Sequence, residues 1–93
     1  MPYAVVITRR FQQAYRRLTP PEQDLVDAAL RQLQTYLQAG QAPVGLGLKR
    51  LHRRTYEVRA GLALRVVYVV EGNTVYVALL GRHDEVQRFL KNQ

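Results

Sequence analysis

The feature that most constrains the fold is a run of three strand-like segments separated by two short turn signals. Tyr56 to Ala60 alternates apolar and charged residues, and Leu64 to Val70 and Val75 to Leu80 are rich in β-branched and apolar residues. Gly61-Leu62-Ala63 suits a three-residue hairpin loop, and Gly72-Asn73 is a two-residue hairpin signal. The run therefore predicts three consecutive antiparallel strands.

The loop lengths also predict which residues face each other. One face becomes entirely apolar, as a core face requires, with the pairs Tyr56–Tyr68, Val58–Val66 and Ala60–Leu64. On the other face Arg59 lies opposite Arg65, Leu80 is expected opposite Arg65, and Arg82 continues on the same side. Two arginines that face each other repel, and no carboxylate is expected directly opposite Arg65. We interpret Glu57, Arg59, Arg65 and Arg82 as one group that acts on an anion.

Helical patterns lie on both sides of these strands. Tyr3 to Thr8 predicts a first strand that is mostly buried. Thr19-Pro20-Pro21-Glu22 is a capping box that ends one helix and starts the next, and Gly40 is a natural stop. The apolar positions of the two helices are Phe11, Ala14, Tyr15 and Leu18, then Leu25, Val26, Ala29, Leu30, Leu33 and Leu37. Residues 41–47 read as a loop, and Asp84 to Gln87 predicts the capped start of a short final helix.

These elements predict an α+β fold in a single domain spanning residues 1–93. The expected order is β-α-α-β-β-β-α, with a twisted, mainly antiparallel sheet and a helical hairpin packed on one face. The absence of cysteine excludes disulfides and thiolate metal sites, and no apolar run is long enough to span a bilayer. We expect a soluble, cytoplasmic protein.

The charge of the chain favours a polyanionic partner. Fourteen basic residues, twelve of them arginine, stand against seven acidic residues, for a net charge of +7. Arginine offers a fork of donors that matches phosphate, so nucleic acid is the first expectation and an acidic protein the second. Lys49, Arg50, Arg53 and Arg54 form a basic cluster that we predict to bind RNA backbone, although such runs are often only solvated. His52, inside this cluster, is interpreted as a structural or surface residue.

Three stretches resemble the RelE/ParE superfamily of toxins from type II toxin–antitoxin pairs. They are Leu48-Lys49-Arg50-Leu51, then Tyr56-Glu57-Val58-Arg59 with Arg65-Val66-Val67-Tyr68, and Gly81-Arg82-His83-Asp84-Glu85-Val86. RelE-type members cut messenger RNA in the ribosomal decoding site, whereas ParE-type members inhibit DNA gyrase on the same fold. The resemblance matches Arg59, Arg65 and Arg82 to basic site residues, and it matches His83 to a subgroup with histidine there. Gln87 departs from the pattern, because a tyrosine often stands at this position.

Metal-independent RNA cleavage starts with attack of the ribose 2′-oxygen on the adjacent phosphorus. It needs a base, cations that stabilise the phosphorane, and an acid for the leaving 5′-oxygen. We assign the cationic role to Arg59 and Arg65, with Arg82 added by the resemblance. Glu57 is either the base or an ion-pair partner of Arg59 or Arg82, and His83 is either the acid or an ordinary capping residue. No phosphate-binding glycine loop, zinc spacing or serine constellation is present, so no cofactor is expected.

The leading hypothesis is a ribosome-dependent mRNA endonuclease that arrests translation. The alternatives are a ParE-type gyrase inhibitor and a catalytically inactive toxin-like binding protein. We also expect an antitoxin partner and a toxin–antitoxin complex that forms a higher oligomer. The physical reason is apolar surface on the arginine side of the sheet, which would accept an extended, partly acidic segment. That surface is expected from Val67, Val69, Tyr76, Ala78 and Leu80.

Overall fold

The structure is a computed structural model that describes residues 3–39 and 47–92. Its elements in chain order are β1 (Ala4–Ile7), α1 (Arg9–Arg16), α2 (Pro20–Ala39), β2 (Lys49–His52), β3 (Thr55–Ala60), β4 (Leu64–Glu71), β5 (Thr74–Gly81) and α3 (His83–Lys91). The predicted α+β order is confirmed with one addition, because β2 is a strand where we predicted only a basic cluster. Gly40 and residues 41–46 of the predicted loop lie outside the described residues.

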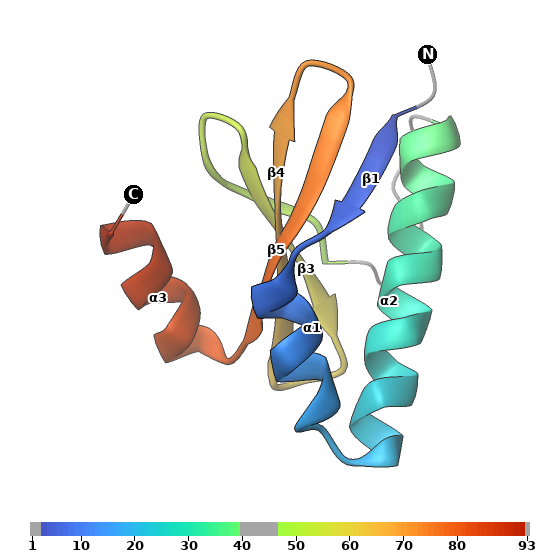
Figure 1. Ribbon diagram of the computed structural model, residues 1–93, viewed down its shortest axis with the longest axis vertical. Helices are drawn as coiled ribbons and strands as arrows, with labels where there is room; N and C mark the ends of the chain where they lie inside the picture. The colour runs from blue at the N-terminus through green and yellow to red at the C-terminus, as the bar shows by residue number, and fades with distance from the viewer. Residues whose placement is uncertain (1–2, 40–46, 93) are drawn as a thin grey trace.

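The five strands form one sheet in the order β1-β5-β4-β3-β2 (Figure 1). β1 runs parallel to β5, and every other neighbouring pair is antiparallel. The β3–β4 register confirms the predicted apolar pairs and also the pairing of Arg59 with Arg65. The three-residue loop and the alternation of side chains were therefore sufficient to fix this hairpin.

A β-bulge in β5 changes the register that we predicted for β4 and β5. Tyr68 pairs with Val77, but Val67 pairs with Leu79, so Ala78 is the extra residue. Beyond the bulge Arg65 faces Gly81, and our prediction that it faces Leu80 was wrong. Leu80 instead lies in the core on the opposite face of the sheet, only 3% exposed.

Thr8 connects this bulge to the start of α1. Its hydroxyl lies 3.1 Å from the carbonyl oxygen of Val77 and 3.2 Å from that of Ala78. The same oxygen accepts a hydrogen bond from the backbone N–H of Phe11, which makes Thr8 the N-cap of α1. The bulge carbonyls are thus satisfied by the residue that also begins the helix.

The helical hairpin covers one face of the sheet and forms the main core with it (Figure 1). Phe11 and Val26 from the helices and Val58 and Val66 from the strands are almost completely buried. The predicted capping box is confirmed, since the Thr19 N–H donates to Glu22 Oε1 at 2.9 Å and the Glu22 N–H lies 3.4 Å from Thr19 Oγ1. Leu25, which we expected in the apolar stripe, is 46% exposed.

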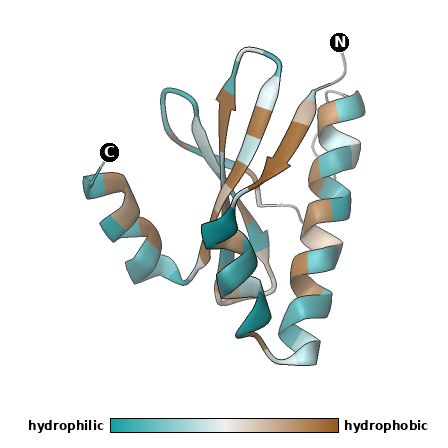
Figure 2. Cartoon of the chain, viewed as in Figure 1, coloured by the Kyte–Doolittle hydropathy of each residue, from teal (hydrophilic) through white to brown (hydrophobic). Residues whose placement is uncertain are grey.

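The first strand differs most from its sequence prediction. Every residue of β1 is exposed, with Val5 at 48% and Val6 at 41%, although an apolar β-branched segment predicted burial. The reason is topological, because β1 is an edge strand and pairs only with β5. Figure 2 shows β1 as an apolar strand on the outside of the sheet. The chain therefore exposes an apolar sheet edge.

α3 packs on the face of the sheet opposite to the helical hairpin (Figure 1). Val67, Leu79 and Val86 are buried in a second, smaller core that also involves Leu51, Phe89 and Leu90. The predicted cover by Phe89 and Leu90 is confirmed. Within residues 3–39 and 47–92, no helix combines the length and apolarity needed to cross a membrane.

Candidate anion-binding face

The candidate site lies on the sheet face that carries α3. Side chains alternate along β3 and β4, so Val58 and Val66 point to the main core while Arg59 and Arg65 share the opposite face. We call the group Lys49, Glu57, Arg59 and Arg65 the arginine face. It contains three cations and one carboxylate, so it favours an anionic ligand.

Glu57 and Arg65 form the ion pair at the centre of this face. Glu57 Oε2 lies 3.5 Å from Arg65 Nε, and the two side chains are only 13% and 17% exposed. Arg65 Nη1 also lies 3.2 Å from the carbonyl oxygens of Leu62 and Leu64. The ion-pair alternative for Glu57 named Arg59 or Arg82 as its partner, and that choice of partner was wrong. Arg65 faces no carboxylate across the hairpin, but it reaches one diagonally.

Arg59 is the exposed cation of the pair, and the described residues hold no carboxylate in ion-pair contact with it. The aliphatic stem of Arg59 packs against Gly47. A Cβ atom on Gly47 would lie 2.8 Å from both Cγ and Cδ of Arg59, and Gly47 has a φ of +64°. Because Gly47 has no side chain, the Arg59 stem can pack against it, and the exposed Arg59 guanidinium is available to a ligand.

Strand β2 divides the predicted RNA-binding cluster between different sites. In the β2–β3 register Lys49 lies opposite Glu57, on the arginine face. Arg50 lies opposite Tyr56, on the other face of the strand. Arg53 and Arg54 occupy the exposed turn between β2 and β3. Alternation along a strand at Leu48 to His52 would have separated Lys49 from Arg50, but we had read these residues only as a basic run. Their role in RNA binding stays a prediction.

Arg82 does not join the arginine face through an ion pair with Glu57. It is the N-cap residue of α3, and its Nη2 lies 3.2 Å from Glu22 Oε2 at the start of α2. Hydrogen bonds from Thr19, followed by the contact with Arg82, lower the pKa of Glu22 below its ordinary value. Our grouping of Arg82 with Glu57 was therefore wrong, and the physical reason is the bulge together with the start of the helix at His83.

His83 is the first residue of α3 and is exposed. The capping sequence starts earlier than we predicted, because the Arg82 N–H donates to Glu85 Oε1 at 3.1 Å. Asp84 is consequently a first-turn residue of the helix. Gln87 also lies exposed on α3. The catalytic roles of His83, Arg59, Arg65, Arg82 and Glu57 stay predictions.

The comparisons with known proteins give a consistent fold. No protein-family model and no curated protein sequence matches this chain. Among solved structures, RelE in the archaeal RelE–RelB complex from Pyrococcus horikoshii is 18% identical, with 88% of this chain and 96% of that chain covered and a TM-score of 0.67. The YoeB dimer from Staphylococcus aureus is 16% identical, with 89% and 99% covered and a TM-score of 0.68.

A third structure, a mutant of the E. coli toxin RelE in the free state, is 17% identical. The match covers 97% of this chain and 93% of that chain, with a TM-score of 0.67. The TM-scores and coverages establish a shared architecture, whereas identities this low leave the chemistry to be argued from the site. The chain therefore shares the fold of these RelE and YoeB structures, as its sequence resemblance implied.

Proposed function

We propose that this protein is the toxin of a toxin–antitoxin pair and cleaves messenger RNA on the ribosome without a metal. The observation that carries the proposal is the arginine face, where Glu57 Oε2 and Arg65 Nε are 3.5 Å apart and Arg59 lies exposed beside them. A proton acceptor and two phosphate-binding guanidinium groups thus share one small area of sheet. The toxin folds of the structural neighbours support the same reading.

In the proposed reaction the ribose 2′-oxygen attacks phosphorus and the bond to the 5′-oxygen breaks. The products are a 2′,3′-cyclic phosphate and a free 5′-hydroxyl. Arg59 binds the phosphate oxygens, and Arg65, held by Glu57, adds positive charge where the phosphorane develops. Glu57 accepts the 2′ proton, and His83 returns a proton to the 5′-oxygen.

An antitoxin partner is proposed on a corrected physical ground. Two of the five apolar residues expected on the arginine side of the sheet are covered, since Val67 is fully buried under α3 and Leu80 belongs to the main core. The other three, Val69, Tyr76 and Ala78, are partly buried. The exposed apolar surface lies along β1 instead. An extended segment could pair with this sheet edge. Two of the structural neighbours were solved as complexes of RelE with RelB.

One observation favours the alternative of a non-catalytic gyrase inhibitor. Arg65 and Arg82 are each paired with a glutamate, and Gln87 stands where a tyrosine often occurs. A protein that only binds its target needs no free catalytic cations. This reading differs from the leading one in its target, which a direct assay can identify.

The deciding experiment is brief expression of the protein followed by mapping of the 5′ ends of translated mRNA. Purified gyrase is assayed for supercoiling in parallel, with Arg59→Gln as the control variant in both assays. The proposal expects cuts within codons that disappear when translation is blocked, and that Arg59→Gln strongly reduces. Loss of supercoiling with intact mRNA would refute mRNA cleavage and support gyrase inhibition. Intact mRNA with normal supercoiling would refute both and support a catalytically inactive binding protein.

A further inference from the structure

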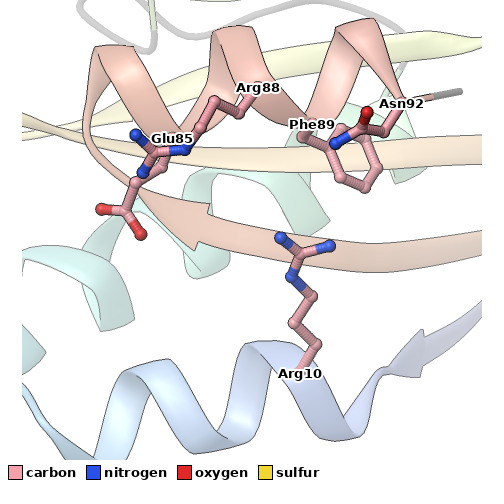
Figure 3. Close-up of a pocket in the computed structure, with 5 residues that line it drawn as sticks. All are labelled: Arg10, Glu85, Arg88, Phe89 and Asn92. Atoms are coloured by element: carbon pink, nitrogen blue, oxygen red, sulfur yellow. The ribbon is translucent and has the colours of Figure 1, made fainter.

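A polar cleft separates α1 from α3, away from the arginine face. Its volume is about 300 Å³, and it is lined by Arg10, Glu85, Arg88, Phe89 and Asn92. Figure 3 shows Arg10 rising from α1 toward α3, with Phe89 and Asn92 on the opposite side. The proposed reaction uses none of these residues.

The short first strand explains why the cleft exists. β1 ends at Ile7 and pairs only with Thr74 to Val77, so the last part of β5 has no neighbour from β1. The chain then turns into α1 on one side of this segment, while α3 follows β5 and packs over Val67 and Leu79. The two helices are thus held apart on either side of β5 (Figure 3).

The charges in the cleft suit a phosphate group. Arg10 and Arg88 approach it from different helices, and the described residues contain no ion pair to either. The single carboxylate, Glu85, is already engaged, since its Oε1 accepts the hydrogen bond of the Arg82 N–H. Two arginines on opposite sides of one cavity can bind the same phosphate in a forked arrangement.

Phe89 adds a flat surface to these charges. The Cζ atom of Arg10 lies 5.5 Å from the centre of the Phe89 ring, a cation–π contact, while Phe89 also packs against the small core under α3. The ring therefore anchors the Arg10 guanidinium. Aromatic rings and guanidinium planes are the surfaces on which unpaired nucleobases stack. Asn92 supplies an amide at the same edge.

The basic surface continues from the cleft along α1. A neighbouring hollow of about 490 Å³ is lined by Arg9, Gln12, Gln13 and Arg16. α1 contains no acidic residue, and Figure 2 shows it as a mainly hydrophilic helix. A polyanion bound in the cleft can therefore extend along α1 without meeting negative charge.

We propose that the α1–α3 cleft binds one nucleotide of single-stranded RNA, with the phosphate between Arg10 and Arg88 and the base against the Arg10–Phe89 pair. The choice of RNA rests on the proposed function, whereas the site itself lies apart from the arginine face. A base within a duplex is already stacked and paired, so the ligand is a single strand.

The test measures fluorescence anisotropy of a labelled single-stranded RNA of roughly ten nucleotides, a length that covers the cleft and α1. Arg10→Gln, Arg88→Gln and Phe89→Leu are compared with Arg31→Gln, which removes an exposed arginine of α2 outside the cleft. Arg10→Gln and Arg88→Gln should each raise Kd roughly tenfold, and Phe89→Leu at least about fivefold. Arg31→Gln should change Kd less than about twofold.

Salt dependence separates a direct contact from a diffuse charge effect. For each lost phosphate contact the slope of log Kd against log salt should fall by roughly 0.7, and Arg31→Gln should leave it unchanged. Equal weakening by Arg10→Gln and Arg31→Gln, or unchanged binding in both Arg10→Gln and Arg88→Gln, would overturn the proposal. Tighter binding of the same sequence as single-stranded DNA would overturn RNA as the ligand.

The two proposals fail in different ways. Cleft variants that bind RNA normally while translated mRNA is still cut would refute the cleft alone. Weakened RNA binding in the cleft variants, together with intact mRNA in the expression experiment, would refute the cleavage function and support the cleft. Phe89 is partly buried, so Phe89→Leu can lower RNA binding simply by destabilising the protein. Arg10 and Arg88 are exposed, so Arg10→Gln and Arg88→Gln should fold normally and decide the test.

Discussion

Arg65 and Glu57 form a largely buried ion pair, with 3.5 Å between Nε and Oε2, although they are not directly opposite each other in the hairpin. Because of this pair, Arg59 and Arg65 contribute differently to the stability of the fold, although they are like-charged neighbours. Arg65 is tied to a carboxylate and to two backbone carbonyl oxygens, while Arg59 is exposed. The two arginines should therefore respond oppositely to the same substitution.

Arg65→Gln should lower the free energy of unfolding by about 1–2 kcal/mol, because it leaves Glu57 buried without its charged partner. The repulsion between Arg59 and Arg65 that the sequence predicts would by itself give this variant an unchanged or slightly higher stability. RNA cleavage should fall roughly a hundredfold if Arg65 stabilises the phosphorane. Arg59→Gln, the matched control, should keep or slightly raise stability because it only removes repulsion. Equal melting temperatures for the two variants would contradict this assignment.

Gly47→Ala should displace Arg59. The substitution combines a positive φ with a Cβ atom 2.8 Å from the arginine stem, so we expect a loss of about 1–2 kcal/mol and reduced RNA cleavage. Gly72→Ala is the control, because its φ is +59° but its Cβ would meet nothing within 4 Å. It should lose stability through strain alone and keep cleavage. Reduced cleavage in both variants would remove Gly47 from the support of the site.

Glu22 should make stability depend on pH in the acidic range. Its pKa in the folded protein is lowered from 4.5, chiefly by the hydrogen bond from the Thr19 backbone. A lowered folded pKa gives stability that is fully present above pH 4.5 and is lost as pH falls through the folded value. Melting temperature should therefore fall in this window, and less so in Glu22→Gln. Parallel pH profiles for both proteins would refute the contribution.

Tyr68 should affect the alkaline limit of stability. Burial raises its pKa well above the ordinary value of 10.0, and its ring stacks on Tyr56 with centroids 5.3 Å apart. The unfolded chain ionises near pH 10, whereas the folded chain resists, so stability should fall as pH rises above 10. Tyr68→Phe should flatten this decline, and Tyr76→Phe on β5 provides the comparison. An identical decline in Tyr68→Phe would assign it to other groups.

The sequence was most informative where local rules determine geometry. The loop at Gly61 to Ala63 and the alternation around Val58 predicted the β3–β4 register, because a one-residue slip would expose the core face. The bulge at Ala78 could not be predicted in the same way. Val77 to Leu80 is continuously apolar, so the side-chain pattern does not change when one residue is added.

Contacts between distant segments were also beyond reach. β1 pairs in parallel with β5 near the other end of the chain, and its edge position explains its exposure. Arg82 binds Glu22 across 60 positions, and nothing in the local pattern of either residue indicates the other. Glu57 and Arg65 were grouped correctly, but an ion pair between diagonal neighbours depends on rotamers rather than on register.

The bulge at Ala78 shifts the pairing of β5 with β4 by one residue for the rest of the strand. Before the bulge, Val77 points to the main core. After it, Leu79 and Leu80 lie on the faces opposite to those they would occupy without the bulge, so Leu80 points to the main core and Leu79 to the core under α3. If β4 and β5 paired without the bulge and with every residue kept, Leu80 would lie opposite Arg65, where Gly81 now lies. Which residue of β5 lies beside Arg59 and Arg65 is therefore determined by one extra residue, Ala78, on β5 and not by either arginine.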